Sequence, residues 1–132
     1  FVEGVSNFAF NSLTFCGHPS MSTKYMSPAL GKYEPDLDIA LHDADVIMTL
    51  RIQHERFEET LNLDLEEYKH AYELTSERLE HAKGDAIVMH PGPVNYIEIS
   101  ESVYQCEQSV IRKQIANGVA IRMAVLSRFL SS

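Results

Sequence analysis

Three short apolar runs, rich in β-branched and other β-prone residues, constrain the fold most, and they occupy residues 13–16, 46–50 and 86–89. None of them alternates regularly between apolar and polar residues, which is typical of strands buried on both faces of a parallel sheet. Helical patterns separate the runs at residues 36–41 and 75–84. This order predicts an α/β fold, a Rossmann-like, three-layer open parallel sheet with flanking helices and right-handed crossovers.

The ends of these helices carry recognisable signals. Asp36 stands at the start of the first pattern, where an acidic residue suits a helix N-terminus. Thr75 is a predicted N-cap of the second, and Gly84 is predicted to end it. Residues 20–35 contain two prolines and several small residues, so we expect a surface loop there.

A long helical pattern closes the sequence, from about residue 107 to residue 130. Its apolar residues recur every three or four positions: Ile111, Ile115, Val119, Met123, Leu126 and Leu130. Gly118 lies inside this pattern and costs about 1 kcal/mol relative to alanine unless a neighbour packs closely there. A helix this apolar needs a partner surface, either the chain's own sheet or a part of the molecule outside this sequence.

Length and charge exclude several classes of function. The 132 residues suffice for one domain, and the net charge of −8 argues against nucleic acid as a main partner. No apolar run approaches the roughly 20 residues of a membrane-spanning helix, and no signal peptide is evident, so we expect a cytoplasmic protein. The two cysteines lack metal-ligand spacing and the six histidines form no HxxxH pair, so we expect no metal.

The segment that follows the second apolar run is chemically unusual. Arg51 and Gln53 are two positions apart, so in an extended backbone both side chains lie on the same face. A guanidinium and an amide placed in this way can bind a small carboxylate. The alternative is a solvated polar loop in which Arg51 pairs with a nearby acid.

The segment after the third run reads His-Pro-Gly-Pro-Val-Asn, residues 90–95. Pro91 and Pro93 remove two N–H donors, which leaves the carbonyls of Pro91 and Gly92 able to accept hydrogen bonds from an amine or amide. One of the X-Pro bonds is a candidate for the cis form. The alternative is a stiff turn that binds nothing. His90 is either a general base or, more commonly for a histidine at a strand end, a structural residue.

At these two loops the sequence resembles the aspartate carbamoyltransferases. The stretch Asp-Val-Ile-Met-Thr-Leu-Arg-Ile-Gln-His-Glu-Arg at residues 45–56 is similar to their signature strand and loop. Residues 68–83, the proline loop at 90–95 and the closing helix at 107–126 match further motifs of the family in the same order. The ornithine-specific relatives usually carry a cysteine-containing loop at the His-Pro-Gly-Pro position, so the resemblance favours aspartate.

The resemblance implies transfer of a carbamoyl group from carbamoyl phosphate to L-aspartate in pyrimidine biosynthesis, without cofactor or metal. Arg51 and Gln53 would hold the carboxylates of aspartate. The backbone of Pro91, Gly92 and Pro93 would orient the carbamoyl amide and the attacking amine. Glu55 and Arg56 would belong to ion pairs of a closed state. The implied assembly is a homotrimer, which in some relatives associates with a regulatory chain or dihydroorotase.

Some family features have no counterpart here. The carbamoyl phosphate domain with its Ser-Thr-Arg-Thr-Arg loop is absent, and Glu-Gly-Val-Ser-Asn at residues 3–7 replaces a segment that carries a second aspartate-binding arginine. Tyr96-Ile97 stands where Arg-Gly is common. We therefore expect residues 1–132 to be an aspartate-binding domain whose N-terminal part is incomplete. We expect this chain alone to have no carbamoyltransferase activity. The alternative is a non-catalytic binding or regulatory domain derived from this family.

Overall fold

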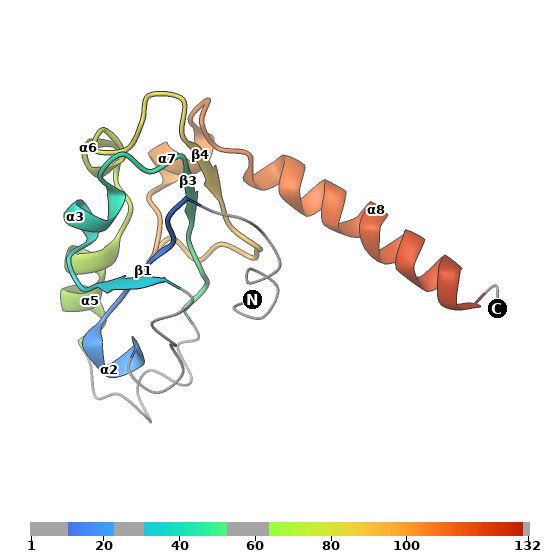
Figure 1. The fold of residues 1–132 in the computed structure, drawn as a ribbon, viewed down its shortest axis with the longest axis horizontal. Helices are drawn as coiled ribbons and strands as arrows, with labels where there is room; N and C mark the ends of the chain where they lie inside the picture. Colours follow the sequence, from blue (N-terminus) through green and yellow to red (C-terminus); the bar gives the residue numbers. More distant parts are fainter. Residues whose placement is uncertain (1–10, 23–30, 53–63, 131–132) are drawn as a thin grey trace.

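The computed structural model describes residues 11–22, 31–52 and 64–130 (Figure 1). Strands and short helices alternate in the first two thirds of the chain, and one long helix closes it. The elements are β1 (Thr14–Cys16), α2 (Pro19–Ser22), β2 (Lys32–Glu34), α3 (Leu37–Leu41), β3 (Val46–Met48), α5 (Leu65–Tyr72), α6 (Ser76–Leu79), β4 (Ile87–Met89), α7 (Glu101–Gln105) and α8 (Ile111–Leu130). Among these described helices, none combines the length and apolar character needed to cross a membrane.

The described strands are joined in two parallel pairs, β1 with β2 and β3 with β4. Ile47 lies opposite Val88 in the second pair, and an isolated parallel bridge joins Val88 to Ser109. A further bridge links Leu74 and Ile99. Each predicted apolar run therefore contains a strand, and the predicted α/β fold with parallel strands, flanking helices and a long terminal helix is confirmed.

The prediction that both faces of these strands are buried is wrong for β3 and β4. Ile47 and Val88 lie in the core, but Val46 is 54% exposed and Ile87 is 37% exposed. These strands alternate between inside and outside, as the two-residue period of a strand dictates. The unbroken apolar sequence of β3 and β4 suggests that both faces of the pair are covered. Within the described residues, only one face is.

The predicted loop over residues 20–35 is also corrected, because it contains the end of α2 and the whole of β2. Gly31 allows the chain to enter β2 beside β1, since a Cβ there would lie 2.5 Å from the Leu13 carbonyl oxygen. The Lys32 amide donates to that same carbonyl at 2.8 Å. The strand thus forms through contact with a distant segment, which its own composition does not indicate.

The predicted helix starts are confirmed in both cases. The Asp36 carboxylate accepts from the amides of Asp38 and Ile39, and the Thr75 hydroxyl accepts from the Arg78 amide. These side chains satisfy donors that the first turn of a helix leaves unpaired. The second helix is shorter than predicted, because α6 ends at Leu79 and residues 80–85 form turns before β4.

One hydrophobic core lies between β3–β4 and the helices α3, α6, α7 and the start of α8. It consists of Leu41, Ile47, Leu74, Leu79, Val88, Ile99, Val103 and Ile111. Only Ile111 comes from α8, and the rest of that helix projects away from the body of the molecule (Figure 1). Its apolar side chains from Ile115 to Leu130 are exposed. Of the two partner surfaces considered for this helix, the chain's own strands therefore pack against the first turns of α8 alone.

Candidate functional site

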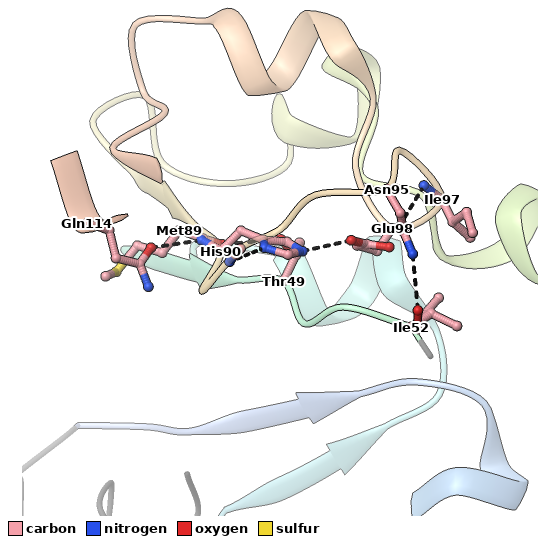
Figure 2. A network of polar contacts seen from close by, with 9 residues as sticks. Thr49, Ile52, Met89, His90, Asn95, Ile97, Glu98 and Gln114 are labelled. Atoms are coloured by element: carbon pink, nitrogen blue, oxygen red, sulfur yellow. Dashed lines mark hydrogen bonds and ion pairs between the residues drawn. The ribbon is translucent and has the colours of Figure 1, made fainter. Parts of the chain in front are cut away.

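The two unusual loops meet because they follow neighbouring parallel strands. In such strands the carboxyl ends lie at one edge, which is where α/β proteins bind ligands. The Thr49 amide and hydroxyl both donate to the Met89 carbonyl, at 3.0 and 3.2 Å. The Asn95 side-chain amide donates to the Ile52 carbonyl at 3.0 Å (Figure 2). The structure thus brings the predicted arginine loop and the proline loop together at one edge.

Arg51 is exposed at this edge, while its neighbour Ile52 is buried. Within the described residues no carboxylate forms an ion pair with Arg51, so the guanidinium is available to an anionic ligand. Gln53, Glu55 and Arg56 lie outside the described residues. Their predicted roles therefore stay predictions.

The proline loop begins directly after β4 and has a defined backbone. The Gly92–Pro93 bond is cis, and Gly92 has φ of +70°, a conformation that favours glycine. A Cβ at Gly92 would lie 3.2 Å from the Ile115 Cδ1 atom in α8. The carbonyls of Pro91, Gly92 and Pro93 accept no hydrogen bond from any described residue. They are therefore free to accept from a ligand, as predicted for an amide or amine.

His90 is fully buried and forms hydrogen bonds that fix the position of this loop. Its backbone amide donates to the Gln114 side chain at 2.9 Å. Its Nδ1 accepts from the Gly92 amide at 2.8 Å, and its Nε2 lies 2.7 Å from Glu98 Oε1 (Figure 2). With both ring nitrogens occupied inside the protein, His90 is placed as a structural residue and not as a general base.

Glu98 is the site residue that sequence reasoning missed. Its side chain is 6% exposed, and its Oε2 atom has no hydrogen-bond partner among the described residues. Burial raises the pKa of Tyr68 above its ordinary value, and nearby negative charge, including that of Glu98, adds to the shift. The available signal was a lone carboxylate between Ile97 and Ile99, because a charge inside an apolar run needs a buried partner.

Potential metal ligands form no cluster in the described part of the chain. No group of three or more histidine, cysteine, aspartate or glutamate side chains there could hold a metal ion.

Burial, with a smaller contribution from the charge of Glu34, raises the pKa of the Cys16 thiol to about 11. At neutral pH this cysteine is therefore a thiol and not a reactive thiolate.

Comparison with known proteins connects this chain to one family. Residues 21–129 match the aspartate/ornithine carbamoyltransferase, Asp/Orn binding domain. The aspartate carbamoyltransferase catalytic subunit of Xanthomonas oryzae pv. oryzae is 51% identical over 96 residues, which cover 72% of this chain and 30% of that protein. The chain thus spans about a third of the length of the curated relatives it matches.

Solved structures agree with this match. Aspartate transcarbamoylase from Trypanosoma cruzi in complex with N-(phosphonacetyl)-L-aspartic acid is 32% identical, with a TM-score of 0.62 over 72% of this chain and 29% of the other. The ornithine carbamoyltransferase from Pyrococcus furiosus is 27% identical, with a TM-score of 0.61 over 74% of this chain and 32% of the other. The chain therefore belongs to the aspartate/ornithine carbamoyltransferase family and carries its Asp/Orn binding domain.

Proposed function

We propose that this chain supplies the aspartate-binding half of an aspartate carbamoyltransferase of pyrimidine biosynthesis. The observation that carries the proposal is the hydrogen bond from Asn95 to the Ile52 carbonyl, which joins the proline loop with its free carbonyls to the segment of the exposed Arg51. A dicarboxylic amino acid needs a cation for its carboxylates and an acceptor for its amine. This edge offers both kinds of group.

The proposed chemistry is transfer by positioning and charge stabilisation. Arg51, assisted by Gln53, binds the carboxylates of L-aspartate through charge-assisted hydrogen bonds. The carbonyls of Pro91, Gly92 and Pro93 accept from the carbamoyl amide and the attacking amine. The amine nitrogen bonds to the carbamoyl carbon as the bond from that carbon to the phosphate oxygen breaks, and the departing phosphate takes the proton that the amine loses. Glu55 and Arg56 are proposed to form ion pairs that stabilise the closed, loaded state.

Two kinds of similarity support aspartate as the acceptor. The curated relatives at 49–51% identity are named aspartate carbamoyltransferase catalytic subunits. The Trypanosoma cruzi enzyme has been solved with carbamoyl aspartate and phosphate, and its structure is 31% identical to this chain. We extend the proposal to a homotrimeric assembly in the cytoplasm, which the native mass of the natural polypeptide carrying these residues would test.

The deciding experiment is a calorimetric titration of L-aspartate into the natural polypeptide that carries these residues, with and without carbamoyl phosphate. We expect Arg51→Ala to weaken aspartate binding about tenfold or more, because it removes a charge-assisted hydrogen bond. Arg128→Ala is the matched control, since it removes the same charge from an exposed position at the end of α8. Equal affinities in both variants would contradict the proposed site. Binding without formation of carbamoyl aspartate would instead favour a non-catalytic domain.

A further inference from the structure

The hydrogen bonds around His90 determine its tautomer. The backbone N–H of Gly92 can only donate, so the His90 Nδ1 atom 2.8 Å away must accept and carries no hydrogen. A neutral imidazole then has its single hydrogen on Nε2, which donates to Glu98 Oε1 at 2.7 Å. Glu98 therefore favours the one tautomer that can accept the Gly92 amide.

This contact determines what the proline loop offers to a ligand. Pro91 and Pro93 have no backbone N–H, so the Gly92 amide is the only backbone donor in residues 91–93. That donor is bound to His90. The carbonyls of the same three residues accept nothing from the described part of the chain. Residues 91–93 consequently present hydrogen-bond acceptors and no free backbone donor.

We propose that His90, with Glu98 behind it, is a positioning and specificity-determining residue of the carbamoyl-transfer site. By binding the Gly92 amide it makes the backbone of residues 91–93 a surface of acceptors alone, which selects a donating group such as a carbamoyl amide or an amine. A carboxylate or phosphate oxygen placed there meets carbonyl dipoles of its own sign and is rejected. This inference rests on the proposed function and assigns to it a residue that does not touch the substrate.

Two substitutions of His90 separate its two hydrogen bonds. In His90→Asn the side-chain oxygen can take the place of Nδ1 and accept from Gly92, but the side chain is too short to reach Glu98. In His90→Gln the longer amide can reach Glu98, but it offers no acceptor near Gly92. Each variant leaves one buried group unpaired, so both should lower the midpoint of urea unfolding, and His90→Asn, which leaves the Glu98 carboxylate unpaired, should lower it at least as much as His90→Gln.

Kinetics then distinguish positioning from mere stability. In the natural polypeptide we expect His90→Gln to lower kcat for carbamoyl aspartate formation about a hundredfold, because a misplaced loop misaligns the reacting groups. KM for aspartate should change much less than kcat, since the proposed carboxylate-binding residue Arg51 lies outside the loop. We expect His90→Asn to keep kcat within about tenfold of the wild type. Equal losses of kcat in the two variants, in an active wild type, would overturn the positioning role.

Nitrogen NMR of the labelled wild type provides a readout that does not depend on turnover. We expect the His90 resonances to show a protonated Nε2 and an unprotonated Nδ1, and the Gly92 amide to exchange slowly with solvent. A hydrogen on Nδ1 would overturn the inference while leaving the proposed function intact. A wild-type polypeptide without turnover would overturn the proposed function instead, whatever the tautomer.

Discussion

The proline loop and the helix α8 are adjacent in the molecule and opposite in character. In the loop, the one backbone N–H of residues 91–93 has a partner, and the side chain beneath it is fully buried. Along α8, the apolar side chains beyond the first turns are exposed. Hydrogen bonds to His90 and Gln114 hold the loop, whereas the outer part of α8 adds no residue to the described hydrophobic core.

The difference shows how local packing distributes stability. The first turns of α8 contribute Ile111 to the core, Gln114 to the His90 amide and Ile115 to the packing beside Gly92. Beyond them, hydrogen bonds within the helix are the main stabilisation, and an isolated helix is marginal in water. We therefore expect substitutions to have large effects at the inner end of α8 and small effects at its outer end.

The strongest test of that contrast compares two aliphatic residues of α8. Ile111 is fully buried, so Ile111→Ala should lower the free energy of unfolding by about 2–5 kcal/mol. Leu126 is 60% exposed, so Leu126→Ala should change it by less than about 0.5 kcal/mol. Urea unfolding of both variants measures the difference. Equal losses in this chain would contradict the described packing, and a large loss for Leu126→Ala confined to the natural polypeptide would show that another part covers α8.

A smaller effect is expected at Gly92, on the rigid side of the comparison. Alanine there would have to adopt φ of +70° with its Cβ 3.2 Å from Ile115. We expect Gly92→Ala to destabilise the fold by about 1–3 kcal/mol, because both the backbone and the neighbouring side chain must shift. Thermal or urea unfolding would measure it. An unchanged midpoint would mean that the loop is less tightly held than its hydrogen bonds indicate.

An effect of opposite sign is expected at Gly118 in the exposed part of α8. A Cβ there would meet only the Arg122 Nη1 atom, at 3.5 Å, which is an ordinary contact with a flexible side chain. Gly118→Ala should therefore stabilise this chain by about 1 kcal/mol through helix propensity. The same substitution in the natural polypeptide, followed by the same unfolding measurement, sharpens the comparison. Destabilisation there would place a neighbouring backbone against Gly118.

Local patterns in the sequence were sufficient to predict three of the four described strands and the starts of α3 and α6. The run around Ile47 indicates a strand by composition, and Asp36 and Thr75 indicate caps by the chemistry of their side chains. The strand at Lys32–Glu34 could not be predicted in this way. Its three polar or aromatic residues form a strand because β1 lies beside them.

The centre of the site was beyond prediction for a related reason. His90 and Glu98 are eight residues apart, and only the path of the intervening loop brings their side chains within 2.7 Å. The residues of that loop predict rigidity, but not where the chain returns. Gln114 is a second case, because its link to His90 depends on the direction in which α8 leaves the core.

The geometry of α8 also has a mechanical consequence. A helix of 20 residues is about 30 Å long, and this one is anchored at Ile111 while its far end stands clear of the body (Figure 1). It is therefore held at one end, and the two residues that contact the proline loop, Gln114 and Ile115, lie only about 5 Å along the axis from Ile111. A force on the outer turns would reach the proline loop along the helix, through Gln114 and Ile115.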